Sequence, residues 1–215
     1  MSRTWHMVHG TQHFFKGGIG TSSRVVEVGG GRYMLGALVQ ANHGDRHLLR
    51  VDGVPVGREI GYDHTPSPWE ERPAEGLAPS PGSGQALRAV EGSIIVVVVT
   101  DAPLIAAQCK RLARRAAVGL ARVGSVAHNG SGDIFIALAT GNHVYTDTKG
   151  LHALSMLPHS LLNPFFEAVA EAVEESILNA LCAAETMTGY RGRTAQALPL
   201  DALQRAMALY GRREA

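Results

Sequence analysis

The sequence of 215 residues has little charge, almost no cysteine and no long hydrophobic run. Charged residues make up 18% of the chain, below the roughly 25% usual in soluble domains, which favours a surface partly buried in a homo-oligomer. The net charge of +1 creates no field that would attract nucleic acid or an anionic membrane. No stretch reaches the ~18 apolar residues of a membrane span, so we expect no membrane partner.

The scarcity of cysteine indicates the cellular compartment in which the protein is found. Cys109 and Cys182 lie far apart, without a C-x-x-C pair, and two core thiols favour a reducing compartment. The N-terminal residues lack the apolar h-region of a signal peptide, so we expect a cytoplasmic protein.

Ten histidines raise the question of a metal. There is no H-E-x-x-H motif, and the helical spacing of His9 and His13 falls in an irregular segment, so we expect no metal site.

The length fits a single domain over residues 1–215. Five segments have the composition of strands: residues 24–28, 33–40, 47–60 with the Asp52-Gly53 turn signal, 93–100 and 132–142. Three segments have helical spacing and end signals: Asp101 to Gly124, Asn163 to about Gly189, and Pro199 onwards. Blocks of strands and helices predict an α+β fold, with helices packed over antiparallel sheet. Residues 62–90 are rich in Pro, Gly and Ser without a period, which predicts a loop or linker.

The stretch GSIIVVVV joins Gly92 and Ser93 to six consecutive aliphatic residues. A run without a polar face predicts a strand covered on both sides. If the Ser93 hydroxyl attacked the carbonyl carbon of Gly92, the chain would break and Ser93 would keep a free α-amine. Such an amine has a pKa of about 7.7–8.0 and acts as a base within its own residue. The alternative is an ordinary serine that opens a strand after a turn, and this stretch alone favours it.

Two other segments place polar side chains at the ends of predicted strands. Ser131 and Asp133 in HNGSGDIF are two residues apart, so in extended backbone they face the same side; a turn that caps the strand would use the same residues. Asn42 in LVQANHG follows a strand, where its amide can aim at a developing oxyanion; a turn-forming asparagine is the alternative. The glycine-rich KGGIGTSSR lacks the G-K-[ST] of a phosphate loop, so a nucleotide site is not expected.

Six segments, in order, resemble the peptidase family of L-aminopeptidase/D-amidase-esterases (DmpA-like enzymes) and β-aminopeptidases. They are FKGGIGTSSRVV, LGALVQANHG, GVPVG, GSIIVVVVTDAPL, GSGDIFIALATGN and ILNALCAAETMTG, and the match covers residues 14–211. The resemblance implies a four-layer αββα sandwich and self-processing at Gly92-Ser93 into residues 1–92 and 93–215. It also implies that Ser93 hydrolyses short peptides, amides or esters, that Ser131 and Asp133 orient this nucleophile, and that Asn42 holds the oxyanion. No metal or organic cofactor is implied.

One departure from that family leaves alternatives open. Family members carry a long segment before the KGGIGT motif, with further strands and a tyrosine at the substrate pocket. Here thirteen residues precede Phe14 and match poorly. Either the chain is an N-terminally truncated relative, with a sheet edge unpaired and apolar surface uncovered, or its gene start lies further upstream. A catalytically inactive homologue with a binding or structural role is therefore the alternative function. An acyltransferase like the ornithine acetyltransferases, similar in fold rather than in motifs, is a third hypothesis.

Overall fold

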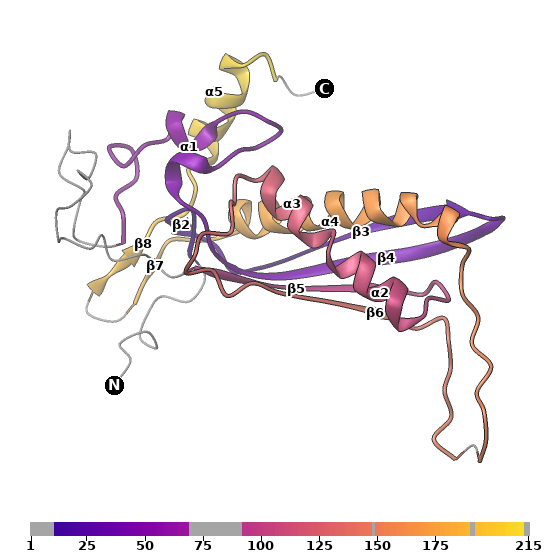
Figure 1. Cartoon of the computed structure of the whole chain (residues 1–215). Coiled ribbons are helices and arrows are strands. Elements are labelled where there is room, and N and C mark those ends of the chain that lie inside the picture. Colours follow the sequence, from indigo (N-terminus) through magenta and orange to yellow (C-terminus); the bar gives the residue numbers. More distant parts are fainter. Residues whose placement is uncertain (1–10, 69–91, 148, 190–191, 213–215) are drawn as a thin grey trace.

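The computed structural model describes residues 11–68, 92–147, 149–189 and 192–212, and its centre is a four-stranded sheet (Figure 1). In order across the sheet, its strands are β3 (Ile19–Val28), β4 (Gly31–Asn42), β5 (Ser93–Thr100) and β6 (Ile134–Ala139). The pairs β3–β4 and β4–β5 are antiparallel, whereas β5–β6 is parallel. The parallel pair corrects the expectation of a purely antiparallel sheet, and the mixture of sheet and helices confirms an α+β fold.

β5 has the bounds that its aliphatic run predicts. Its side chains alternate between the two faces of the sheet, as they do in any extended strand. Ile94, Val96 and Val98 are fully buried, whereas Ile95 is 39% and Val99 is 38% exposed. The expectation of a strand covered on both sides is therefore met on one face only.

Helices cover one face of the sheet, so the described residues form a helix layer over a sheet layer (Figure 1). α4 (Asn163–Cys182) lies over β3 and β4, α2 (Ala106–Ala113) lies beside β6 and β5, and α3 (Ala116–Arg122) packs on α4. Apolar side chains of both layers meet in one core, and burying each of them contributes about 1.5–3 kcal/mol. They include Leu35, Val39, Ile94, Val96 and Val98 from the sheet, and Leu112, Leu120, Phe165, Val169, Val173 and Ile177 from the helices.

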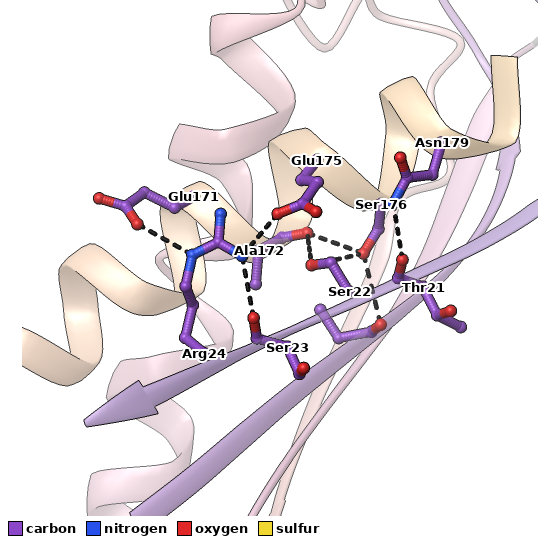
Figure 2. Close-up of polar contacts among 10 residues, drawn as sticks. Thr21, Ser22, Ser23, Arg24, Glu171, Ala172, Glu175, Ser176 and Asn179 are labelled. Carbon is purple, nitrogen blue, oxygen red and sulfur yellow. Dashed lines mark hydrogen bonds and ion pairs between the residues drawn. The ribbon is translucent and has the colours of Figure 1, made fainter. Parts of the chain in front are cut away.

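A polar seam fixes α4 on β3 (Figure 2). Arg24 of β3 donates from Nε to Glu171 at 3.0 Å and from Nη1 to Glu175 at 2.5 Å. Ser22 donates its hydroxyl to the carbonyl oxygen of Ala172 at 2.7 Å. These contacts come from one strand edge and one helix face, so they set the position of the helix along the strand.

The predicted helix from Asp101 to Gly124 is wrong at its start and in its middle. Helix α2 begins only at Ala106, and a break at residues 114–115 separates it from α3. Asp101 does not cap the helix, because its Oδ1 accepts a hydrogen bond from the backbone N–H of Met34 at 2.7 Å. Gly124, with φ +98°, follows the end of α3 as predicted.

Several smaller elements also differ from the prediction. Helix α4 ends at Cys182, well before Gly189, and β7 (Met187–Thr188) then pairs with β8 (Thr194–Ala195). Residues 47–60 contain no strand: they hold part of the 3₁₀ helix η2 (Arg46–Leu48), one bridge between Val51 and Val54 around the predicted Asp52-Gly53 turn, and α1 (Val56–Glu59). The thiol of Cys109 is half-buried and Cys182 is exposed, so the second is not a core thiol.

The remaining elements lie at the ends of the sheet. β1 (Thr11–Gln12) and β2 (Phe15–Lys16) form a short hairpin, and the 3₁₀ helix η3 (His159–Leu161) precedes α4. Helix α5 (Leu200–Leu209) begins directly after Pro199, as predicted. Most of the predicted linker at residues 62–90 lies outside the described residues. Across the described ranges, no helix has the length and apolar character needed to cross a bilayer.

Candidate active site

Ser93 and Asn42 are direct neighbours across two strands. Ser93 opens β5, and its register partner is Asn42, the last residue of β4. Residues directly opposite each other place their side chains on the same face, with Cβ atoms about 4.5–5.5 Å apart. By the alternation of β5, this is the face of Ile95, which the helices leave uncovered. A hydroxyl and an amide from two strands thus share one small area at the end of the sheet.

Gly92 packs tightly against the chain that follows β4. A Cβ added at Gly92 would lie 3.0 Å from the carbonyl oxygen of Asn42 and 3.1 Å from the Cα of His43. Both neighbours are backbone atoms, which move less easily than the end of a side chain. The close approach favours glycine here and holds the Gly92-Ser93 peptide beside Asn42.

The loop before β6 brings a hydroxyl and a carboxylate to Ser93. Asp133 Oδ1 accepts a hydrogen bond from the Ser131 hydroxyl at 2.6 Å and another from the backbone N–H of Ile94 at 3.2 Å. A Cβ added at Gly132 would lie 3.8 Å from the Cβ of Ser93, so the loop is in contact with the serine. Parallel strands begin at the same edge of a sheet, which is why the starts of β5 and β6 meet here. The structure therefore brings all four residues singled out in the sequence to one place.

Thr11 fixes the orientation of the Asn42 side chain. Its backbone N–H and its hydroxyl both donate to Asn42 Oδ1, each at 3.2 Å. Because the amide oxygen is held by two donors, the amide NH₂ points away from Thr11 and is left as a donor. No pattern in the sequence predicts this contact, since Thr11 lies 31 residues from Asn42 in a segment without a period.

A second contact joins the two loops at the site. Nδ1 of His128 lies 3.7 Å from the carboxylate of Asp45, and the backbone N–H of Ser131 donates to the carbonyl oxygen of His128 at 2.8 Å. Asp45 follows β4 and His128 precedes β6, so the contact places the loop of Asn42 against the loop of Ser131. Both side chains are exposed, so the contact contributes at most about 1 kcal/mol to stability.

Three buried polar side chains, Gln12, His13 and His43, belong to the segments that adjoin Thr11 and Asn42. The rings of His13 and His43 meet edge to face, with centroids 5.3 Å apart. Burial lowers the pKa of His13 to about 4 and the pKa of His43 to about 3, so both rings are neutral at pH 7. Within the described ranges, both polar atoms of the Gln12 side chain, Nε2 of His13 and both ring nitrogens of His43 meet no hydrogen-bond partner.

Arg46 holds the backbone around these histidines. Its guanidinium is buried and donates to the carbonyl oxygens of His13, Phe14, Thr65 and Ile60 at 2.7, 2.9, 3.2 and 3.4 Å. It also lies over the ring of Phe15, 3.4 Å from the centroid. Burial lowers its pKa to about 10, so the group stays charged at neutral pH. Arg46 thereby ties the hairpin of β1 and β2, which carries Thr11, to the segment that follows Asn42.

A groove elsewhere on the molecule and the question of a metal site complete the description. A groove of about 500 Å³ between α2 and β6 is lined by residues 135–139, Leu104, Ala106, Cys109, Lys110 and Ala113, none of which is a candidate site residue. In the part of the chain that the structure describes, no three His, Cys, Asp or Glu side chains gather in a way that would hold a metal ion.

The chain is similar in sequence and in structure to known aminopeptidases. The model of peptidase family S58 matches residues 9–195. Beta-peptidyl aminopeptidase BapA of Sphingosinicella microcystinivorans is 43% identical over 199 residues, which are 92% of this chain and 49% of that protein. The solved beta-aminopeptidase of Burkholderia sp. is similar with a TM-score of 0.78 and 41% identity, over 95% of this chain and 52% of its own.

A second solved structure extends the likeness. It is the L-aminopeptidase D-Ala-esterase/amidase of Ochrobactrum anthropi, a serine aminopeptidase with a variant of the Ntn hydrolase fold. The TM-score is 0.78 at 38% identity, over 95% of this chain and 51% of that one. The present chain thus spans about half the length of the relatives that it matches.

Proposed function

The chain belongs to peptidase family S58, and from that premise we propose that it is a self-processing aminopeptidase with an N-terminal serine nucleophile. The observation that carries this proposal is the shared position of Ser93, Asn42 and the Ser131–Asp133 pair at one end of the sheet. The proposed substrates are short peptides, amides or esters, in keeping with relatives named as aminopeptidases, an amidase and an esterase. Two free thiols fit the cytoplasm as the compartment.

Self-processing begins when Oγ of Ser93 attacks the carbonyl carbon of Gly92. The bond from that carbon to the Ser93 nitrogen breaks, an ester to Oγ forms, and the hydroxyl proton passes to the departing amine. Water then hydrolyses the ester, which leaves a carboxylate on Gly92 and a free amine and hydroxyl on Ser93. The products are residues 1–92 and 93–215, and the reaction consumes one water and no cofactor.

The same groups then act on the substrate. The α-amine of Ser93 takes the hydroxyl proton while Oγ attacks the substrate carbonyl, and it returns the proton to the leaving amine or alkoxide. The NH₂ group of Asn42, oriented by Thr11, donates to the oxyanion that develops. In this proposal the carboxylate of Asp133, which accepts hydrogen bonds from the N–H of Ile94 and from the Ser131 hydroxyl, orients the neighbouring amine of Ser93. Water releases the acyl group from Ser93 in the last step.

The replacement Ser93→Ala tests the proposal. The unchanged protein is expected to give two fragments that begin at Met1 and Ser93, whereas Ser93→Ala remains one chain of 22.8 kDa without activity. The control is Ser23→Ala, since Ser23 is an exposed serine of β3 on the same face as Ser93. Intact-mass measurement and N-terminal sequencing read the outcome. Cleavage at residue 92 in Ser93→Ala would overturn the mechanism, and a folded starting protein that stays whole and inactive would favour the inactive homologue.

A further inference from the structure

Lys16 carries a charge that the rest of the chain almost completely covers. The residue is only 8% exposed, and its Nζ donates to the carbonyl oxygen of Gly17 at 2.5 Å. Among the described residues, no carboxylate forms an ion pair with this ammonium group. An ammonium has three N–H donors, so one neutral oxygen leaves most of its charge uncompensated. Covering such a charge without a counter-charge weakens the folded state.

The Lys16 side chain keeps its charge at neutral pH. Burial lowers its pKa below the usual range of a lysine. A lysine becomes neutral at pH 7 only when its pKa falls by more than about three units, a shift confined to fully buried groups. Lys16 keeps part of its surface in water, and its bond to the Gly17 oxygen favours the charged form. The chain therefore holds a cation here at a cost to its stability, which points to a role outside folding.

The backbone places Lys16 at the end of the sheet that carries the candidate active site. The pairing of β3 with β4 continues for one pair beyond the bounds of β3, because the N–H of Ala41 donates to the carbonyl oxygen of Gly18 at 3.0 Å. The next position along the two segments sets Gly17 beside Asn42. Since the Lys16 ammonium is bound to the Gly17 oxygen, its charge lies next to the strand end that carries Asn42.

The hairpin of β1 and β2 places Lys16 near Asn42 by a second route. Lys16 is the register partner of Thr11, and directly opposite residues have their side chains on the same face, with Cβ atoms about 4.5–5.5 Å apart. The Thr11 hydroxyl in turn donates to Oδ1 of Asn42 at 3.2 Å. Both routes thus place the Lys16 charge on the Asn42 side of the candidate site.

The charges at this end of the sheet follow the order of the strands. Asn42 lies beside Ser93, and the Lys16 charge lies beyond Asn42. Asp133 lies on the other side of Ser93, where its carboxylate accepts a hydrogen bond from the N–H of Ile94. In the proposed reaction, negative charge develops on the oxygen that faces Asn42, and positive charge develops on the Ser93 amine. The fixed charges therefore have the signs that stabilise both.

We propose that Lys16 supports the oxyanion electrostatically: its ammonium group, held beyond Asn42, stabilises the negative charge that develops when Ser93 attacks a carbonyl. This inference rests on the proposed function and adds a residue to it. Charges fixed in advance act strongly where water is excluded, because the effective dielectric constant near a protein charge is about 20 instead of about 80. Lys16 does not touch the reacting atoms, so its effect belongs to the transition state and not to substrate binding. Self-processing and hydrolysis both pass through an oxyanion, and Lys16 acts in both.

The replacement Lys16→Met, made in the complete chain, removes the charge and keeps the length of the side chain. With a short peptide amide as substrate, we expect kcat per processed molecule to fall about tenfold and KM to stay within about twofold. This loss is smaller than the roughly 10²–10³-fold loss caused by removing a direct oxyanion donor. The half-time of self-processing, followed by intact mass, should lengthen by a similar factor. In urea, the unfolding midpoint should be at least as high as that of the starting protein, because an apolar side chain replaces an unpaired covered charge.

Two matched variants serve as controls. Lys16→Arg keeps the charge and is expected to retain kcat within about threefold of the starting protein. Lys110 is an exposed lysine of α2, so Lys110→Met should leave kcat, KM and the rate of self-processing unchanged. The same peptide with a free C-terminal carboxylate is measured beside the peptide amide, which separates support of the oxyanion from binding of a substrate carboxylate.

Several outcomes would overturn the inference. If Lys16→Met is as active as an active starting protein, this inference fails and the proposed function stands. If Lys16→Met unfolds at lower urea, or if Lys16→Arg loses as much kcat as Lys16→Met, Lys16 has a structural role only. A loss confined to KM for the peptide with a free carboxylate would make Lys16 a substrate-binding group. A starting protein that neither processes itself nor hydrolyses the peptides would overturn the proposed function, and this inference with it.

Discussion

Thr11 determines how a single amide at the candidate site is presented. Its N–H and hydroxyl both bind the oxygen of Asn42, and an amide fixed in this way needs no reorganisation when an oxyanion forms. Neither group of Thr11 needs to touch the substrate for this purpose. Thr11 is thus a positioning residue, and its effect should appear in the transition state rather than in substrate binding.

The replacement Thr11→Val removes the hydroxyl and keeps both the shape and the backbone N–H bond. We expect kcat to fall about tenfold with KM nearly unchanged, because the loss of one hydrogen bond that positions the oxyanion donor costs about 1–1.5 kcal/mol. Steady-state kinetics with a short peptide amide measure both constants. The control is Thr146→Val, at an exposed threonine of the connection after β6. Equal kcat values in the two variants would remove Thr11 from the mechanism.

At the scale of elements, Gly20 decides how closely α4 approaches β3. A Cβ at Gly20 would lie 1.9 Å from the carbonyl oxygen of Ser176 and 2.9 Å from the backbone nitrogen of Ala180. Both are helix backbone atoms, so the whole helix would have to move. The hydrogen bonds of Ser22 and Arg24 to α4 depend on this close approach (Figure 2).

Gly20→Ala is therefore expected to lower the free energy of unfolding by about 2–3 kcal/mol, the cost of overpacking a well-filled contact. Urea denaturation of the Ser93→Ala chain, whose uniform length simplifies the transition, measures it. The control is Gly36→Ala in β4, where the nearest atom to an added Cβ is 4.0 Å away; we expect a change within about 1 kcal/mol. If both variants are equally stable, the helix is not held at this distance by Gly20.

Elements that depend on local sequence were predicted well. The aliphatic run predicts both ends of β5, and the Gly-rich turn predicts the β3–β4 hairpin. Pro199 marks the start of α5. The predictions failed where a distant contact wins over local signals. Asp101 has the character of a helix cap, but its carboxylate binds Met34 of β4, and α2 starts later.

In the candidate site, too, the residues with local sequence signals could be predicted, and those that act through distant contacts could not. Ser93, Asn42, Ser131 and Asp133 stand at the ends of strands with recognisable patterns, and the pairing of β4, β5 and β6 brings these ends together. Thr11 and Arg46 act through contacts with residues 31 and 33 positions away, and no periodicity or spacing in one sequence records such pairs. The roles of the four residues in catalysis remain predictions, of which the replacement of Ser93 tests the first.

At the scale of the whole molecule, the buried histidines make stability depend on pH. A histidine in the unfolded chain has a pKa of about 6.5, whereas burial lowers the pKa of His13 to about 4 and of His43 to about 3. The contact of His13 with Asp45 opposes this shift, while Arg46 and His47 add to it. Between these pKa values the unfolded chain binds protons that the folded chain excludes. The stability is thus complete above about pH 6.5 and is lost as the pH falls through the window toward 4 and 3.

Replacing His43 by leucine separates the contribution of His43 to this pH dependence from the contribution of His13. The ring nitrogens of His43 meet no partner among the described residues, so His43→Leu removes a titrating group without breaking a hydrogen bond found there. As the pH is lowered from about 7.5 to about 4.5, the unfolding free energy of the variant minus that of the starting protein should rise by roughly 2–3 kcal/mol. The reason is that each pH unit below 6.5 costs the starting protein about 1.4 kcal/mol of stability through His43. Urea titrations at several pH values measure this difference, and the exposed His152→Leu serves as control. Parallel stability curves for His43→Leu and the starting protein would mean that His43 takes up a proton in the folded state, which its burial opposes.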